Sequence, residues 1–199
     1  MRPRASGLKA VRGIIHSVAI ALLVVAGQPV SASIKPPPGG QIPCDFVTGG
    51  GFIVGSGSTT PPTSSLAEGA RANFGVGGGV KNGAFWGHLE YNDHSTSPPM
   101  QVHGTSVTGY FLGTNPNGNG RIITGTARIN GTDGFTYMVE VTDNGEPGRG
   151  IDEFSITLSN GLEFYEAGSN YGDGPIAGGN IQLHKANPSN TPPLGFTCS

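Results

Sequence analysis

Short apolar runs that alternate with turn residues dominate the pattern of this 199-residue chain. Residues 84–91 show the pattern most cleanly. One face of this segment carries Phe85, Leu89 and Tyr91, and the other carries Trp86, His88 and Glu90. A period of two residues is that of a β-strand with one buried face.

Similar runs predict the other strands of the domain. We expect them over residues 46–54, 71–76, 101–112, 121–129, 135–141, 154–158, 162–165 and 180–185. The glycine triplet 49–51 should interrupt the first of these runs, and the triplet 77–79 should end the second. Turn clusters at 115–120, 130–134 and 159–161 indicate connections between neighbouring strands. The one weak helical candidate is 65–72, about two turns long.

This pattern predicts one antiparallel all-β domain, a sandwich or barrel-like fold of about eight or nine strands. A parallel sheet is not expected, because no helical crossovers join the runs. The 35 Gly and 16 Pro residues reach a level that can indicate disorder. However, only 12% of the residues are charged and 35% are hydrophobic, which favours a folded domain. The same glycine and proline content excludes a long helical protein.

The first 32 residues have the composition of a signal peptide. A basic start is followed by the apolar stretch 18–26, and Val30-Ser31-Ala32 offers small residues for cleavage. The stretch is shorter than the roughly 20 residues that span a bilayer, so a retained anchor is less favoured. We expect a signal peptide over 1–32, a Pro/Gly linker over 33–43 and a single secreted domain over 44–199. Its predicted location is extracellular or periplasmic.

Removing this leader leaves an acidic chain. The leader holds four of the 11 Lys and Arg residues and none of the 13 Asp and Glu residues, so seven cations face 13 acids, a net charge of −6. Nine acidic residues lie from Asp133 to Asp173, where Arg149 is the sole cation. Nucleic acid and anionic membranes are therefore not expected as partners. An extracellular glycan or a cell-surface protein remains open.

Two cysteines, Cys44 and Cys198, lie near the two ends of the predicted domain. In an oxidising compartment they predict one disulfide. A catalytic thiol or a metal ligand is less favoured, because no His or second Cys stands at ligand spacing from either.

Four segments occur in an order that resembles a known family. They are residues 47–53 (VTGGGFI), 72–75 (ANFG), 125–131 (GTARING) and 178–185 (GGNIQLHK). Together they are similar to a bacterial extracellular domain of the post-choice-of-anchor type, over most of the chain after Cys44. The resemblance implies a secreted or surface-associated all-β module without an assigned catalytic activity. It supplies no catalytic residues to carry over.

The acidic loop 143–153 offers oxygen ligands for a metal ion. Calcium favours several oxygen ligands on a flexible loop, and the candidates here are Asp143, Asn144, Glu146 and Asp152. Their spacing does not match an EF-hand. The alternative that we favour is a loop whose Asp and Asn side chains bond their own backbone, with Glu146 or Asp152 paired to Arg149.

Three histidines, His88, His94 and His103, fall on or beside one predicted hairpin near Glu90 and Asp93. Imidazoles with a carboxylate can hold zinc. His88 and His94 are too far apart on one strand for both to ligate unless the turn folds back. Ordinary surface or hydrogen-bonded histidines are therefore the favoured interpretation.

The sequence also offers candidates for a glycosidase site and for a sugar-binding surface. Carboxylate pairs such as Asp152–Glu153 or Glu163–Glu166 would suit glycoside hydrolysis only at a defined separation. Candidates for a sugar-binding surface are Trp86, Tyr91, Tyr110, Phe111, Tyr165 and Tyr171. Aromatic residues at alternating strand positions are more often core.

The function predicted from these features is a secreted, non-catalytic β module with a structural, adhesive or ligand-binding role, carbohydrate being one candidate ligand. The alternative is a secreted hydrolase, metal-dependent or supported by calcium. The sequence contains no phosphate loop, nucleophile elbow or zincin motif. No catalytic residue and no cofactor other than the calcium candidate is predicted.

Overall fold

The computed structural model describes residues 40–199, and the predicted signal peptide lies outside these residues. Nine strands form one antiparallel sheet in the order β10-β2-β3-β4-β5-β6-β7-β8-β9, curled into a half-barrel, and a parallel pair joins β1 to β11. The predicted all-β, barrel-like fold is confirmed. The strands are β1 (Gln41–Ile42), β2 (Phe46–Val54), β3 (Arg71–Lys81), β4 (Ala84–Asp93), β5 (Met100–Leu112), β6 (Gly120–Ile129), β7 (Thr132–Thr142), β8 (Glu153–Ser159), β9 (Phe164–Gly168), β10 (Gly178–His184) and β11 (Thr197–Cys198), with a 3₁₀ turn η1 at Ser169–Tyr171.

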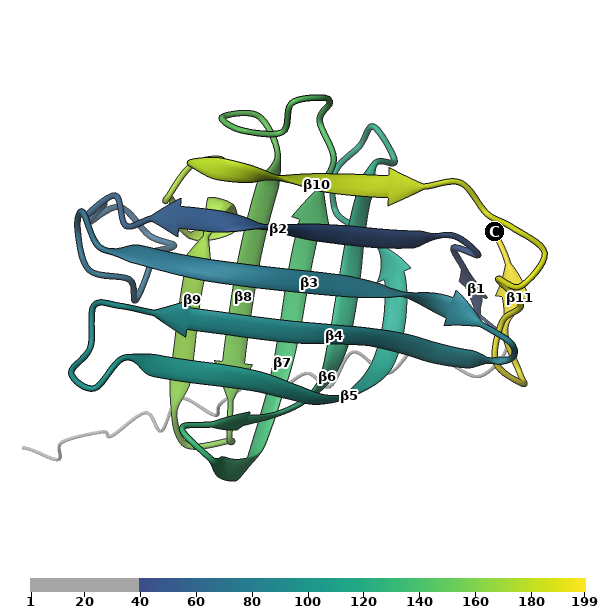
Figure 1. The fold of residues 1–199 in the computed structure, drawn as a ribbon, viewed down its shortest axis with the longest axis horizontal. Coiled ribbons are helices and arrows are strands. Elements are labelled where there is room, and N and C mark those ends of the chain that lie inside the picture. The colour runs from purple at the N-terminus through teal and green to yellow at the C-terminus, as the bar shows by residue number, and fades with distance from the viewer. Residues whose placement is uncertain (1–39) are drawn as a thin grey trace, which may run out of the picture.

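Figure 1 shows the large sheet folded over on itself into two layers. Strands β10, β2, β3 and β4 form the front layer, and β6, β7, β8 and β9 run behind them in a transverse direction. Strand β5 belongs to both layers, because its first residues pair with β4 and nearly its whole length pairs with β6. The register with β6 shifts between Gly104 and Ser106 and again between Val107 and Gly109. Such irregularities bend a strand, so they account for the fold of the sheet at β5.

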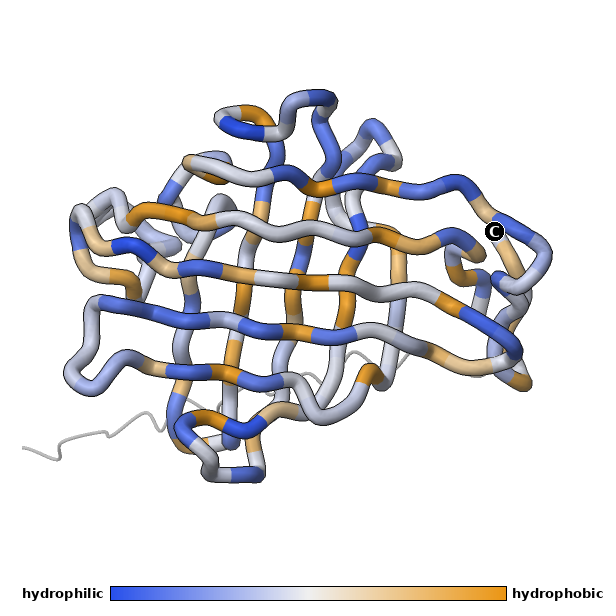
Figure 2. The backbone as a smooth tube through the Cα atoms, in the orientation of Figure 1, coloured by the Kyte–Doolittle hydropathy of each residue, from blue (hydrophilic) through white to orange (hydrophobic). Residues whose placement is uncertain are grey.

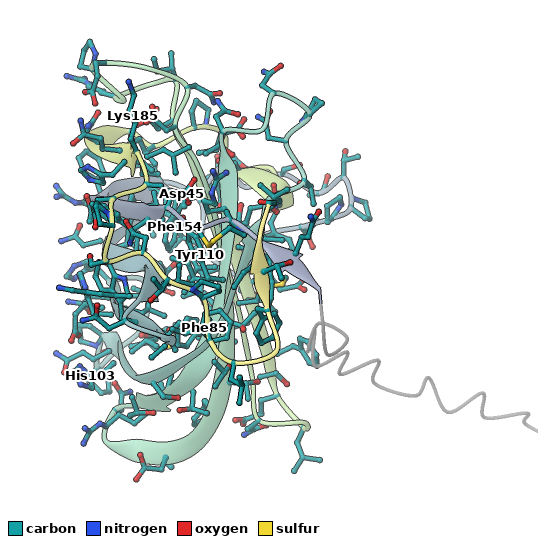
Figure 3. All side chains as sticks on the ribbon, turned by 90° about the vertical axis from the view of Figure 1, so that its right-hand side faces the viewer. Asp45, Phe85, His103, Tyr110, Phe154 and Lys185 are labelled. Carbon is teal, nitrogen blue, oxygen red and sulfur yellow. A yellow bond between two sulfur atoms is a disulfide. The ribbon has the colours of Figure 1, made fainter. Side chains whose placement is uncertain are left out.

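The apolar core lies between the two layers. Phe74 of the front layer stacks on Phe154 of the rear layer, with ring centroids 4.0 Å apart. Phe154 and Tyr110 lie between the layers in Figure 3, and apolar and polar positions alternate along the strands in Figure 2. Burying one large apolar side chain contributes roughly 1.5–3 kcal/mol. The core also includes Ile53, Val76, Leu89, Ile123, Val139, Ile156, Leu158 and Ile181.

The predicted faces of β4 are confirmed. Leu89 and Tyr91 are buried, and Phe85 packs against the core. His88 and Glu90 are exposed on the opposite face.

The glycine triplets do not interrupt the strands, so that prediction was wrong. Strand β2 runs through residues 49–51, and β3 continues past residues 77–79 to Lys81. A Cβ added at Gly51 would lie 2.1 Å from the carbonyl oxygen of Gly178, and one at Gly78 would lie 2.7 Å from Ile123 Cδ1. These glycines therefore mark places where a neighbouring strand or the opposite layer comes too close for a side chain.

Other boundaries also differ from the predictions. The turn expected over 130–134 contains only Asn130 and Gly131, both with positive φ (49° and 82°), and β7 already begins at Thr132. A two-residue turn with positive φ at both positions matches the twist of a hairpin. Residues 65–70 form turns and bends rather than a helix. Within the described residues, no helix is long and apolar enough to cross a membrane.

Cys44 and Cys198 form the predicted disulfide, with Cα atoms 5.3 Å apart. The bond joins the residue two positions before β2 to the last residue of β11. Strands β1 and β11 therefore lie together at one end of the half-barrel (Figure 1).

Candidate ligand-binding face

The acidic loop lies along the outer edge of β10. Asp152 is buried, and its two carboxylate oxygens accept hydrogen bonds from the backbone N–H groups of Asn144 (2.9 Å) and Ile181 (2.8 Å). Asp143 accepts a hydrogen bond from the backbone N–H of Leu183 at 2.8 Å. Ile181 and Leu183 belong to β10, so the loop carboxylates occupy donors on the edge that β2 does not pair.

The other calcium candidates make similar local contacts. The Asn144 amide donates to the Ile151 carbonyl at 2.7 Å, and Glu146 accepts a hydrogen bond from Asn180 Nδ2 at 2.9 Å. The ion pairs found among residues 40–199 do not include the pairing with Arg149 expected from the sequence. Nor do three His, Cys, Asp or Glu side chains in this range gather closely enough to hold a metal ion. Calcium binding at this loop stays a prediction.

The three histidines of the predicted zinc group lie apart. The His88 ring lies over Gly77 of β3, since a Cβ at Gly77 would be 2.9 Å from its Cε1 atom. His103 hydrogen-bonds Glu90 across β4 and β5, and His94 is exposed in the turn after β4. The histidines are thus surface or hydrogen-bonded side chains, as the favoured interpretation expected.

A buried ion pair links the start of β2 to the rear layer. Arg121 forms an ion pair with Asp45, and the Tyr110 hydroxyl donates to the same carboxylate at 2.7 Å. Burial, together with the nearby Asp45 charge, raises the pKa of Tyr110 far above its ordinary value of 10.0. Tyr110 therefore stays protonated and serves as a hydrogen-bond donor in the core.

A second polar cluster crosses the layers near the β4–β5 turn. The Tyr165 hydroxyl donates to the buried Asp93 at 2.9 Å and lies 2.7 Å from the Tyr91 hydroxyl. Burial raises the pKa of both tyrosines. Like the Asp45 cluster, this one holds layers together and does not face solvent.

The outer face is the surface of β10, β2, β3, β4 and the start of β5 that points away from the core. It carries an aromatic row formed by His184, Phe46 and Trp86, which stand in register across the strands with Gly79 between Phe46 and Trp86. The Phe46 ring stacks on His184 with centroids 4.3 Å apart, and its centroid lies 5.9 Å from that of Trp86. His184 is held by a 2.8 Å hydrogen bond to Thr48.

Of the aromatic residues predicted for a sugar-binding surface, only Trp86 reaches this face. Tyr91 and Tyr110 are buried in the core, and Tyr171 bonds Thr157 at 2.6 Å on the rear layer. Phe46 and His184 could not be identified from the sequence, because only the cross-strand register brings these two residues beside Trp86. The residues next to Phe46 and His184 in the sequence contain no motif that would identify either one as part of a binding surface.

A polar groove of about 680 Å³ lies on the same face, over β3, β4, β5 and the end of β6. His103, one of its lining residues, projects outward from the face in Figure 3. In register, Glu90 stands opposite His103, which stands opposite Arg128. The polar side chains that line the groove are Asn73, Glu90, Asn92, Gln101, His103 and Arg128.

Two glycines in register, Gly50 and Gly75, form an open floor at and beside the polar groove. A Cβ added at Gly75, which lines the groove, would meet nothing within 4 Å, and one at Gly50 would meet only the Phe74 carbonyl at 3.5 Å. Neither residue has a positive φ. Packing and backbone conformation therefore do not require glycine at these two positions, unlike at Gly51 and Gly78.

Two enclosed polar atoms on this face have no hydrogen-bond partner among the described residues, Trp86 Nε1 and Asn92 Oδ1. Unsatisfied buried polar atoms are uncommon in folded proteins. They lie at the two ends of the face, one in the aromatic row and one in the polar groove.

No protein-family model, no curated protein and no solved structure matches this chain. The assignment of function therefore depends on the chemistry of the outer face.

Proposed function

We propose that this chain is a secreted, non-catalytic binding module that holds a carbohydrate on its outer face. The observation that carries the proposal is the combination on one surface of the aromatic row, the polar groove and a glycine floor that packing does not require. Aromatic rings supply apolar contact area for the C–H faces of sugar rings, with a polar tip in Trp. Convergent polar groups beside an apolar surface are what fixes a ligand's orientation.

The groove side chains have the chemistry that sugar hydroxyls need. Asn73, Asn92 and Gln101 each present both a donor and an acceptor, and Glu90 accepts. Asn92 Oδ1 has no hydrogen-bond partner among the described residues, so a hydroxyl that reached it would satisfy it. These features support a ligand with many hydroxyl groups.

Binding without turnover is supported by the carboxylates. Glycoside hydrolysis generally uses two carboxyl groups that flank one bond. Glu90 is the one carboxylate among the residues that line the groove, and it is hydrogen-bonded to His103. Of the pairs considered from sequence, Asp152 is buried against β10 and Glu163 accepts a hydrogen bond from Asn160 at 3.0 Å. The alternative of a secreted hydrolase receives no support from these positions.

The proposal of secretion combines two features. The first is the leader-like composition of residues 1–32, and the second is the disulfide between Cys44 and Cys198, which suits an oxidising compartment.

Trp86 gives a direct test, because it is the only tryptophan in the chain. We expect its fluorescence to change on titration of the disulfide-bonded protein with soluble polysaccharides. Trp86→Ala should weaken retention on the bound polysaccharide by about tenfold, the loss of one aromatic contact of about 1–1.5 kcal/mol. Phe164→Ala is the matched control, since Phe164 is 50% exposed on the rear layer.

A second variant fills the groove without removing any contact. Gly75→Gln places a side chain in open space and should abolish binding, while the melting temperature stays near that of the parent. Binding that survives both Trp86→Ala and Gly75→Gln would exclude the outer face as the site. Release of reducing sugars that is lost in Glu90→Gln would instead favour the hydrolase.

A further inference from the structure

The charges of this protein are unevenly distributed over its surface. Five of the 11 Lys and Arg residues precede residue 40, which leaves six cations against all 13 acidic residues in the described part. Nine of the acidic residues lie from Asp133 to Asp173, in β7, β8, β9 and their connecting loops. The rear layer and the loop at the edge of β10 are therefore the acidic parts of the molecule.

The outer face has the opposite character. Arg71 and Lys81 of β3 lie on it, and Arg128 of the neighbouring strand β6 lines its groove. Three histidines, His88, His103 and His184, also lie on this face. On its strands β10, β2, β3, β4 and β5, the carboxylates are Glu90 and the buried Asp93. Glu146 reaches the β10 edge of the face beside Asn180, three strands away from Glu90.

Both arginines are exposed, and the Arg71 side chain is also held by two contacts. Arg71 lies over the Phe52 ring, with its Cζ 3.8 Å from the ring centroid, and its Nε donates to Asn73 at 2.6 Å. Arg128 stands beside His103 and lines the groove. A fixed, exposed guanidinium presents a fork of donors that matches a carboxylate or a sulfate.

From this arrangement we infer that the ligand is an acidic polysaccharide, a polymer whose sugar rings carry carboxylate or sulfate groups that Arg71 and Arg128 bind. The inference rests on the proposed function and adds the charge of the ligand to it. The attraction is local, because the chain as a whole is acidic and would repel an anionic polymer from its other surfaces.

The geometry favours a polymer over a single small acid. Arg71 and Arg128 lie on β3 and β6, three strand spacings apart, so their backbones are separated by about 14 Å measured along the sheet. The two arginines are also offset by four residues along the strands, since Arg128 stands in register with His103, Glu90 and Gly75. Trp86 and Glu90 are four residues apart on β4, about 13 Å along the strand. A ligand that contacts the aromatic row and both arginines therefore has several rings and more than one charge.

The face suits a glycan better than a membrane or a nucleic acid. Those surfaces carry dense negative charge over a wide area and would also meet the acidic loop along β10. The aromatic row and the amides of the groove would have no role in binding phosphates alone. Anionic vesicles and duplex DNA are therefore comparison ligands in the test.

The test compares one polymer in two charge states. A uronic acid polymer and the same polymer with its carboxyl groups reduced to alcohols are titrated into the disulfide-bonded protein, with Trp86 fluorescence and calorimetry as readouts. A sulfated polysaccharide identifies which anion is preferred. We expect the uronic acid polymer to bind at least about tenfold more tightly than its reduced form, and added salt to remove this difference.

The variants are Arg71→Gln, Arg128→Gln and their combination, with Arg149→Gln as the control cation, exposed in the acidic loop. The double variant should lose the preference for the acidic polymer, and Arg149→Gln should keep it. Melting temperatures of all variants confirm that each one folds.

Each other outcome overturns the inference in a distinguishable way. Equal binding of both polymers, unaffected by the arginine variants, would contradict the acidic ligand and leave carbohydrate binding standing. Equal affinity for vesicles of anionic phospholipid or for duplex DNA would show unselective attraction of anions. Binding of no polysaccharide would remove the proposed function itself.

Discussion

Gly51 and Gly75 lie on neighbouring strands and have different reasons for lacking a side chain. A Cβ at Gly51 would lie 2.1 Å from a backbone oxygen of β10, whereas a Cβ at Gly75 would meet nothing within 4 Å. The first glycine is required by the fold, and the second leaves the groove open.

This difference predicts that the same substitution has a large effect on stability at Gly51 and a small one at Gly75. Gly51→Ala should destabilise the protein by about 1–3 kcal/mol, because the strands must separate to admit the methyl group. Gly75→Ala should change the unfolding free energy by no more than about 1 kcal/mol. Urea denaturation of both variants measures this, and equal losses would contradict the account of the glycine floor.

The ion pair between Arg121 and Asp45 is the second prediction at the residue scale. The two side chains are 6% and 18% exposed, so neither charge has full access to water. Asp45→Asn leaves the guanidinium without its counter-ion and should lower the unfolding free energy by about 3–5 kcal/mol.

Two comparison variants make this prediction specific. Tyr110→Phe removes one hydrogen bond to the same carboxylate and should lower the unfolding free energy by about 1 kcal/mol. Asp45→Asn combined with Arg121→Met should be less destabilised than the sum of the two single variants, since no unpaired charge remains. Simple additivity in denaturation measurements would show that the pair is not coupled.

At the scale of elements, the edge of β10 depends on the loop between β7 and β8. Asp152→Ala leaves the N–H groups of Asn144 and Ile181 without their acceptor, at a cost of about 1–3 kcal/mol for each group that water cannot reach. A freed strand edge can also pair with another molecule. We therefore expect a lower melting temperature and concentration-dependent association in light scattering.

Glu146→Ala is the matched control from the same loop. Its carboxylate contacts Asn180 in an exposed position, so stability should change by less than about 0.5 kcal/mol. Similar effects of the two variants would argue against the edge-capping role of Asp152.

The same loop is where the predicted calcium ion can be tested. Binding to the native state would raise the melting temperature in a calcium-dependent manner, and a chelator would lower it. Because both Asp152 oxygens already accept backbone hydrogen bonds, we expect calcium and chelator to leave the melting temperature within about 1 °C. A rise of several degrees that disappears in Asp143→Asn would establish the calcium site.

At the scale of the whole molecule, the buried tyrosines predict how the fold fails at high pH. Burial raises the pKa of Tyr91, Tyr110 and Tyr165 well above 10.0 and that of Tyr137 to about 12. Above pH 10 the unfolded chain loses these protons while the folded chain keeps them, so stability is full below that pH and falls above it. Each tyrosine lowers the free energy of unfolding by about 1.4 kcal/mol per pH unit, and four together lower it by about 5–6 kcal/mol per unit.

We therefore expect tyrosinate absorbance and the loss of β-sheet circular dichroism to appear together, in one cooperative step above pH 10. Tyr137→Phe should move this step to higher pH. Ionisation of most tyrosines near pH 10 with the dichroism unchanged would mean that they are not buried as described.

The sequence predicted the strands of the front layer only in part. The alternation in β4 identified both its faces and put His88 and Glu90 on the outer one. The run now seen as β3 was predicted to stop at Val76, because glycine usually weakens a strand. The strand continues through the glycines because tertiary contacts require them there: Gly78 lies against Ile123 of the rear layer.

Fewer residues of the candidate site could be predicted from the sequence. Trp86 and Glu90 were singled out, but Phe46, Arg71 and Arg128 were not, because they come from strands far apart in the chain. Their proximity depends on the cross-strand register and on the bend in β5. Neither can be predicted from the residues of one strand alone.

By itself, the sequence determined the all-β class, the pairing of Cys44 with Cys198 and the inward and outward faces of the clearest strand. The class and the faces follow from a local two-residue period, and the disulfide follows because the chain has only two cysteines to pair. Only the tertiary structure decided that the glycine triplets lie inside strands, that the acidic loop caps β10 and that cations and aromatic rings share one face. Each of these depends on which strand lies beside which, a property of the whole sheet.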